Sequence, residues 1–221
     1  MARVVSIGEQ DFEGLITRNN FYIDKTHLIK EWWESDDIVT QITRPRRFGK
    51  TLNMSMLECF FSLDYKDRGE LFHNLSIWDE KSSDGDYKYR ELQGTYPVLF
   101  LSFAGVKANN YTDARAQILR MIENLYTKYA FIKKSDVLEQ NEKDFWNRVG
   151  VKMTDSDAAM TLHQLAGYLC RYYGKKVILL LDEYDTPMQG AYVFGYWDDM
   201  VIFMRSFLFW FYRRRGLYRH G

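Results

Sequence analysis

Three short runs of apolar residues along the chain predict buried β-strands. Residues 38–43 are rich in β-branched side chains, residues 97–103 are almost continuously apolar, and residues 176–182 are mostly apolar and end in Asp182. A strand that is covered on both faces carries such an unbroken run, whereas a strand with one exposed face alternates apolar and polar residues. We therefore expect three buried strands.

Apolar residues at three- and four-residue spacing predict helices between these strands. One pattern starts at Thr51, a second spans residues 114–129, and a third spans residues 162–173, after which Gly174 is expected to end the helix. Strands that alternate with helices indicate an α/β fold with a mainly parallel sheet.

Polar residues dominate segment 65–93, which we expect to form a surface excursion with one short helical piece near residues 71–75. The chain has 221 residues, which suits a single domain. Residues 200–212 are apolar enough to suggest a membrane anchor, but the stretch is too short to span a bilayer and contains Arg205. A buried or partner-covered helix is the better interpretation, although the arginines at 213–215 would suit an interfacial anchor.

Composition narrows the function classes. Lys plus Arg and Asp plus Glu number 30 each, so the formal net charge is zero and gives no general attraction to nucleic acid. Cys59 and Cys170 lie far apart without metal-binding spacing, and we expect buried, reduced thiols. The four histidines are scattered, which argues against a histidine metal site. Acidic residues interrupt the first fifteen positions, so we expect no secretory signal and a cytoplasmic protein.

The tripeptide Gly49-Lys50-Thr51 stands between a predicted strand and a predicted helix. In that context a Gly-Lys-Thr turn directs backbone N–H groups at a polyphosphate, the lysine contacts the outer phosphates, and the hydroxyl binds magnesium. Arg44 occupies the position of the first glycine of the usual motif. The tripeptide alone is therefore a weak signal.

A second signal is the Asp182-Glu183 pair at the end of the last apolar strand. Asp182 would hold magnesium together with Thr51, and Glu183 would activate the attacking water. Ligands of parallel sheets lie beyond the carboxyl ends of the strands, so we expect both signals at the same edge. The alternative is a plain acidic cap on a buried strand. The two motifs in this order favour nucleotide binding.

Other charged residues near these motifs leave alternatives open. Arg44, Arg46 and Arg47 could bind phosphate or a nucleic-acid backbone, or could pair with surface carboxylates, and the zero net charge favours phosphate or intramolecular roles. Asp185 could be catalytic or could cap the turn before Pro187. The Asp-Glu-x-Asp box of superfamily-two helicases is similar, but this chain has no room for a second motor lobe.

Four segments together resemble the bacterial AAA-ATPase-like family: residues 22–26 (Tyr-Ile-Asp-Lys-Thr), 43–55, 97–103 and 179–187. The similarity extends from about Ile7 to Phe207. The loop Arg-Pro-Arg-Arg-Phe-Gly-Lys-Thr is similar to the family's own phosphate loop, so Arg44 is a family trait. The role of residues 22–26 does not follow from the sequence.

The resemblance implies a P-loop NTPase of the ASCE type, an α/β three-layer sandwich with ATP and Mg²⁺ as ligands. Thr51 and Asp182 would bind the metal, and Glu183 would be catalytic. The implied nucleotide-binding (Walker A) residues are Arg46, Arg47, Phe48, Gly49, Lys50 and Thr51, and the Walker B pair is Asp182 and Glu183.

The resemblance also implies a missing part. Family members continue into a sensor strand and usually a PD-(D/E)XK nuclease-like region, whereas residues 209–221 look unrelated. We expect a domain over residues 1–208, followed by a divergent tail that reflects a truncation or frameshift. Without the sensor strand, hydrolysis should be slow or absent. The alternatives are a nucleotide-dependent binding module without turnover, and a nucleic-acid-associated accessory domain.

Overall fold

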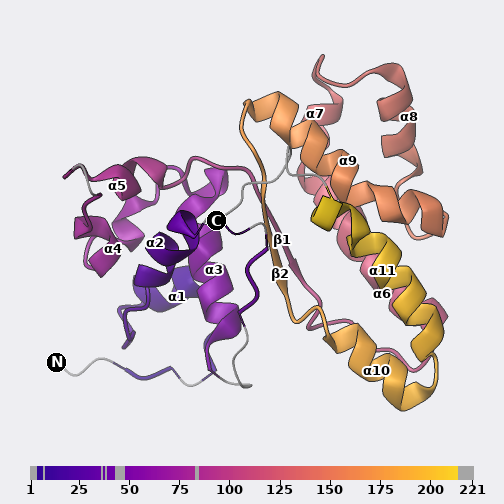
Figure 1. The fold of residues 1–221 in the computed structure, drawn as a ribbon, viewed down its shortest axis with the longest axis horizontal. Coiled ribbons are helices and arrows are strands. Elements are labelled where there is room, and N and C mark those ends of the chain that lie inside the picture. The colour runs from indigo at the N-terminus through magenta and orange to yellow at the C-terminus, as the bar shows by residue number, and fades with distance from the viewer. Residues whose placement is uncertain are drawn as a thin grey trace. The chain divides into compact units, whose positions relative to one another are not determined.

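The computed structural model describes residues 4–6, 8–35, 37, 39–42, 48–82 and 85–213, with side chains up to residue 208. The described chain divides into two compact units (Figure 1). Unit 1 extends to Val98 and unit 2 begins at Leu99.

Unit 1 consists of short helices. In chain order they are α1 (Phe12–Thr17), α2 (His27–Glu34), α3 (Lys50–Phe61), the 3-10 turns η1 (Leu63–Tyr65) and η2 (Gly69–Leu71), α4 (Ser76–Asp79) and α5 (Lys88–Leu92). The longest of them, α3, begins at the Gly-Lys-Thr turn, as the sequence predicts.

The core of unit 1 is aromatic. Phe60 lies edge-on to Phe61 and to Phe72, with ring centroids 5.0 and 5.1 Å apart, and Phe72 stacks on Phe12 at 5.2 Å. Segment 65–93 contributes Phe72, Ile77 and Tyr89, each of which is fully buried. The prediction of a surface excursion is correct only in part: residues such as Lys66 and Asp67 are exposed, whereas these apolar side chains and Leu71 are buried in the core of unit 1.

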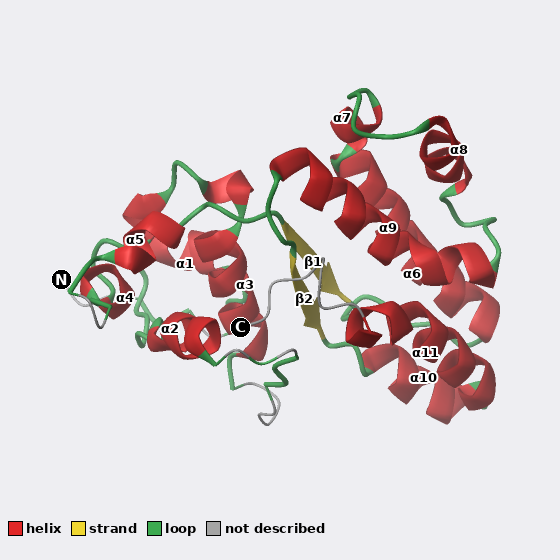
Figure 2. Ribbon diagram, turned by 45° about the horizontal axis from the view of Figure 1, so that its top comes forward, coloured by secondary structure: helices red, strands yellow, loops and turns green. Residues whose placement is uncertain are grey.

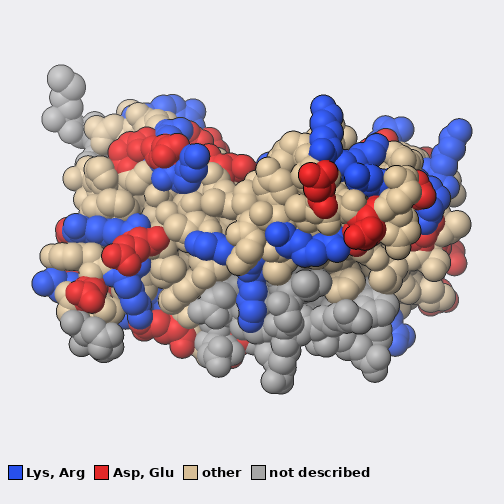
Figure 3. All heavy atoms as spheres, turned by 90° about the horizontal axis from the view of Figure 1, so that it is seen from above, with Lys and Arg blue, Asp and Glu red and all other residues tan. Residues whose placement is uncertain are grey.

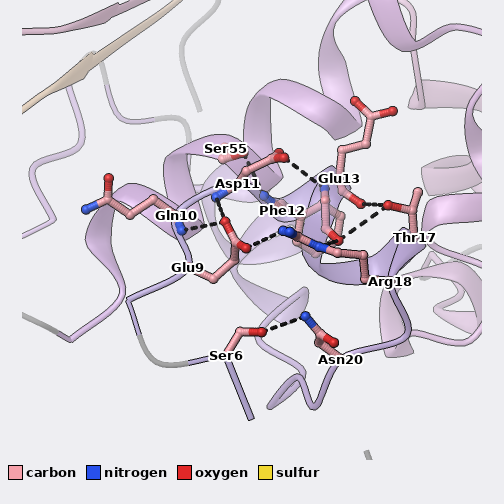
Figure 4. Close-up of polar contacts among 11 residues, drawn as sticks. Ser6, Glu9, Gln10, Asp11, Phe12, Glu13, Thr17, Arg18, Asn20 and Ser55 are labelled. Atoms are coloured by element: carbon pink, nitrogen blue, oxygen red, sulfur yellow. Dashed lines mark hydrogen bonds and ion pairs between the residues drawn. The ribbon is translucent and has the colours of Figure 1, made fainter. Parts of the chain in front are cut away.

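Polar contacts surround the start of α1, and one of them reaches α3 (Figure 4). Asp11 caps α1 by accepting a hydrogen bond from the Gly14 N–H at 3.0 Å, and the Phe12 N–H donates to the Ser55 hydroxyl of α3 at 3.0 Å. Arg18 donates to the Gly14 carbonyl at 2.8 Å and forms an ion pair with Glu9. The capped end of α1 thus anchors the middle of α3.

Unit 2 combines a small parallel sheet with helices, so the chain as a whole is mixed α/β. The sheet pairs β1 (Val98–Ser102), which starts at the last residue of unit 1, with β2 (Ile178–Asp182) (Figure 2). The connection between the strands contains α6 (Tyr111–Lys128), α7 (Ala130–Lys133), α8 (Gln140–Arg148) and α9 (Asp155–Tyr173), and β2 is followed by α10 (Thr186–Phe194) and α11 (Trp197–Arg213). Parallel strands require such a long crossover.

The boundaries of the long helices have clear local causes. Asn110 caps α6 by accepting from the Asp113 N–H at 2.9 Å, and Thr154 caps α9 by accepting from the Asp157 N–H at 3.1 Å. Helix α9 ends at Gly174, whose φ of +64° is easily adopted only by glycine. The sequence prediction of this helix end is confirmed.

Helix α11 contains the apolar stretch that begins at Met200. Met200, Phe203, Met204 and Phe207 are buried, and α11 packs against α9 and α6. One face of α11 is therefore buried, whereas Ile202 on the helix is 66% exposed, so the expectation of a buried helix holds for that face alone. No helix in the described ranges is long and apolar enough to cross a membrane.

The predicted strand at residues 38–43 does not form in its described part. Residues 39–42 are not in a strand, and Val39 is 51% exposed. A strand needs a paired neighbour to satisfy its backbone groups, and the sheet of the described residues consists of β1 and β2 alone. Residues 38 and 43 lie outside the described residues.

The cysteines differ in environment. Cys59 of α3 is 1% exposed, and burial raises the pKa of its thiol to about 12. Cys170 of α9 is free as well but only half-buried. The expectation of reduced thiols holds for both residues, and that of full burial holds for Cys59 alone.

Candidate functional site

The Gly49-Lys50-Thr51 turn forms the start of α3. Gly49 is the N-cap residue with φ of +74°, a left-handed conformation that is strained for other residues. Lys50 and Thr51 are the first two helical residues, and the Asn53 N–H donates to the Gly49 carbonyl at 3.0 Å. The first N–H groups of a helix have no intrahelical acceptor and carry the positive end of its dipole. The turn thus places the backbone of Gly49, Lys50 and Thr51 at the positive end of α3.

Part of the predicted loop falls outside the described residues. Arg44, Arg46 and Arg47 belong to segment 43–47, so their predicted contacts stay predictions. Phe48 is described and is 60% exposed. Lys50 and Thr51 are partly exposed, and hence accessible to a ligand.

Asn53 lies one helical turn beyond Gly49 and was not predicted as a site residue. The residue is 2% exposed, and its amide nitrogen Nδ2 has no hydrogen-bond partner among the described residues. Burying an unpaired amide donor is unfavourable. The sequence signal was available, since a polar asparagine stands within the apolar periodicity of α3.

Asp182 is the last residue of β2 and lies at the carboxyl end of the sheet. Its side chain is only 5% exposed, and its one hydrogen bond to a described side chain is a long one, 3.4 Å, from the Ser102 hydroxyl at the end of β1. The Asp182 carbonyl accepts from the Phe103 N–H at 2.9 Å, which fixes the two strand ends side by side. A buried carboxylate with so little compensation is typical of a cation-binding position.

Ser102 was not singled out from the sequence. It ends the apolar run at residues 97–103 with a hydroxyl, as Asp182 ends the other run with a carboxylate. Because parallel strands finish at the same edge, a polar residue at the end of β1 is a recognisable signal for a site neighbour.

Glu183 follows Asp182 in a strained conformation. Its φ is +47°, which is uncommon outside glycine, and its side chain is exposed. The Thr186 N–H donates to the Glu183 carbonyl at 2.9 Å, and the Thr186 hydroxyl lies 3.3 Å from the Glu183 carboxylate. Backbone strain at a candidate catalytic residue is a pattern found at functional sites.

Asp185 occupies the N-cap position of α10, but its side chain makes no capping hydrogen bond. Its carboxylate accepts a hydrogen bond from the Gln189 side chain at 2.7 Å, and Pro187 lies in the first turn of the helix. The Asp185 carboxylate thus binds a side chain one turn further along the same helix. Of the two roles considered for it, the capping role is not realised by its side chain.

The predicted site residues fall into both units. Lys50 and Thr51 belong to unit 1, and Asp182 and Glu183 belong to unit 2. Lys50 and Thr51 start α3, and Asp182 and Glu183 end and follow β2, respectively. Their meeting at one sheet edge stays a prediction. Among the described residues, no group of three or more His, Cys, Asp and Glu side chains forms a metal cluster.

On one face of the molecule, charges of both signs are mixed, in keeping with the zero net charge. Lys and Arg side chains are interspersed with Asp and Glu over the face seen in Figure 3. A mixed pattern of this kind gives no broad attraction for a polyanion.

A Gly-Lys-Thr turn at a helix start and an apolar strand ending in Asp-Glu are features of nucleotide-binding proteins. The model of the family described as "Predicted AAA-ATPase" matches residues 6–216. The chain therefore belongs to this AAA-ATPase-like family.

A protein of Azotobacter chroococcum mcd 1, described as "Uncharacterized protein in vnfD 5'region", is 27% identical over 183 residues. The aligned part is 82% of this chain and 29% of that protein, so the chain spans less than a third of its relative's length. No solved structure gives a significant match.

Proposed function

We propose that this chain is an ATP-binding P-loop domain of the ASCE type, with the three-layer sandwich architecture of that class. The observation that carries the proposal is the left-handed Gly49 at the start of α3, followed directly by Lys50 and Thr51. Membership in the AAA-ATPase-like family adds the expectation that the polyphosphate is that of ATP.

The residues of the turn fit a polyphosphate. The N–H groups at the start of α3 would donate hydrogen bonds to phosphate oxygens, Lys50 would contact the outer phosphates, and Thr51 would offer its hydroxyl to magnesium. By resemblance, Arg46, Arg47 and Phe48 complete the loop.

Asp182 fits a magnesium site because, within the described part of the chain, its buried carboxylate has only the long hydrogen bond from Ser102. Magnesium, when bound, would neutralise charge on the phosphates. Glu183 has the exposed carboxylate that activation of a water molecule requires. We propose Asp182 as a metal ligand and Glu183 as the general base.

Nucleotide titration by calorimetry tests ATP binding. Lys50→Ala should weaken ATP binding at least tenfold, because it removes a charge-assisted contact to phosphate. Lys66→Ala is the matched control, because Lys66 is an exposed lysine of unit 1. This variant should bind ATP with the affinity of the wild type. The proposal fails if wild type does not bind ATP, or if Lys50→Ala binds it unchanged.

Phosphate release separates an ATPase from a binding module without turnover. In an ATPase, Glu183→Gln should abolish release while ATP binding is retained, since the side chain keeps its size and loses its basicity. Slow release that Glu183→Gln leaves unchanged would remove the catalytic assignment and favour a nucleotide-dependent binding module.

A further inference from the structure

The segment Tyr22-Ile-Asp-Lys-Thr26 has no role in the site described above, yet unit 1 holds it firmly. The Tyr22 hydroxyl lies 3.3 Å from the sulfur of Met56 in α3 and accepts a hydrogen bond from the Lys25 N–H at 3.3 Å. The Tyr22 ring packs edge-on against Phe12 with centroids 5.5 Å apart. These contacts fasten the start of the segment to α1 and α3.

Asp24 and Thr26 fasten the other end of the segment to α4. The Asp24 carboxylate accepts from the Ser76 N–H at 2.7 Å and from the Thr26 N–H and hydroxyl at 2.8 and 2.7 Å. The Thr26 side chain is fully buried, and its hydroxyl also accepts from the Ile77 N–H at 3.2 Å. The backbone on both sides of Lys25 is therefore fixed.

Lys25 lies between these anchors, and its ammonium group lies beside the phosphate turn. An ideal Cβ built on Gly49 would lie 3.6 Å from the Lys25 Nζ. Among the described residues neither Lys25 nor Lys50 forms an ion pair, whereas Lys30 pairs with Glu80 and Lys88 pairs with Glu34 in the same unit.

Two lysines at the start of α3 are electrostatically unfavourable without an anion. The N-terminus of a helix is its positive end, so it repels ammonium groups and attracts anions. A solvated surface lysine would be expected to turn away from this end. A lysine whose backbone is fixed on both sides and whose ammonium lies beside Gly49 instead suits a bound polyanion.

We propose that Lys25 is a second lysine of the phosphate site, whose ammonium binds oxygen atoms of the nucleotide's polyphosphate next to Gly49. This rests on the proposed function, because it adds a residue to the same site. Tyr22, Asp24 and Thr26 are positioning residues that hold Lys25 there. This assigns a function to the segment of residues 22–26.

Calorimetric titration of the full chain with Mg²⁺-ATP and with inorganic tripolyphosphate tests the assignment. Lys25→Ala should weaken the binding of both probes by about tenfold, because both carry the phosphate oxygens that the ammonium contacts. Lys25→Arg keeps the charge and should recover most of the affinity. Lys66→Ala should leave both affinities unchanged. Circular dichroism and thermal unfolding of Lys25→Ala should match those of wild type. If Lys25→Ala does not fold, Lys25→Gln replaces it in the binding titrations.

The outcomes distinguish this inference from the proposed function. The role of Lys25 is overturned, and the ATP site is kept, if ATP binding depends on Lys50 but has the same affinity in Lys25→Ala or Lys25→Gln as in wild type. Lys25-dependent binding of tripolyphosphate without ATP binding would support Lys25 and overturn the nucleotide assignment. Wild type that binds neither probe overturns both.

Discussion

The Asp24 carboxylate accepts a hydrogen bond from the backbone N–H of Ser76 at 2.7 Å and so joins two parts of unit 1 that are 52 residues apart in sequence. Partial burial alone would raise the pKa of this carboxyl. The hydrogen bonds from Ser76 and Thr26 outweigh the effect of burial, and the pKa is lowered. The charged carboxylate is therefore the form that stabilises the fold.

We predict that Asp24→Asn lowers the free energy of unfolding by about 1–3 kcal/mol at pH 7, because the donors lose a charged acceptor. A lowered folded-state pKa means that this contribution is present above the ordinary aspartate pKa of about 3.9 and is lost as pH falls through the folded value. Urea unfolding at pH 7 and at pH 3 measures both effects. The exposed Asp67 is the control, and an Asp67→Asn loss of similar size would contradict the prediction.

Tyr22→Phe should lower the free energy of unfolding by about 0.5–1.5 kcal/mol, since the Lys25 N–H loses its acceptor. Burial raises the pKa of Tyr22 to about 12. A raised folded-state pKa gives stability that is complete below pH 10 and lost as pH rises toward 12. The difference in ultraviolet tyrosinate absorption between wild type and Tyr22→Phe should show one group titrating near that pH. If the tyrosine that is absent from the Tyr22→Phe titration has a pKa near 10 in wild type, the burial argument is contradicted.

Gly49→Ala should cost about 1–2 kcal/mol in unfolding free energy, because alanine is strained at a φ of +74°. The described residues leave room for the methyl group, since the nearest atom among them is the Lys25 Nζ at 3.6 Å. Gly174→Ala is the matched control. Gly174 has a φ of +64° at the end of α9, and a Cβ added there would have no other described residue within 4 Å apart from its chain neighbours. Chemical unfolding should show similar losses, while calorimetry should show weakened ATP binding only in Gly49→Ala.

Glu183→Gly should raise the free energy of unfolding by about 1 kcal/mol, because glycine adopts the φ of +47° without strain. Glu183→Gln keeps the strain and should leave stability near that of wild type. Both variants should lose any phosphate release that wild type shows. Equal stability of the two variants would show that the backbone at this position is not strained.

Asp182→Asn should raise the free energy of unfolding by about 1–2 kcal/mol without ligand, because a neutral amide is easier to bury than a carboxylate with one long hydrogen bond. The same change should reduce the rise in melting temperature that Mg²⁺-ATP produces. The exposed Asp136 provides the control, and Asp136→Asn should change neither quantity. A destabilised Asp182→Asn would mean that the carboxylate has a structural role.

The sequence was most informative where local chemistry decides the structure. The apolar runs at 97–103 and 176–182 form β1 and β2, and Gly49 and Gly174 lie at the helix ends where their left-handed φ is required. Two strands of a parallel sheet and two helix ends could therefore be predicted from short windows of residues.

Tertiary contacts account for what the sequence did not reveal. Segment 65–93 is polar on average and has many exposed residues, but its side chains Phe72, Ile77 and Tyr89 are buried in the core of unit 1. The β-branched run that includes Val39–Ile42 forms no strand in its described part, since strand formation depends on a neighbour and not on propensity alone. Lys25 was missed because its proximity to Gly49 depends on hydrogen bonds to residues more than 50 positions away.

The two thiols provide a kinetic probe for each unit. Cys59 belongs to unit 1 and, with a pKa near 12 and 1% exposure, should react with an alkylating reagent only when that unit opens. Cys170 belongs to unit 2 and is half-buried, so its alkylation should be faster. Mass spectrometry of the two labelled peptides would thus measure local opening in each half separately, and the protection of Cys59 by ATP would measure how far the ligand suppresses opening of unit 1.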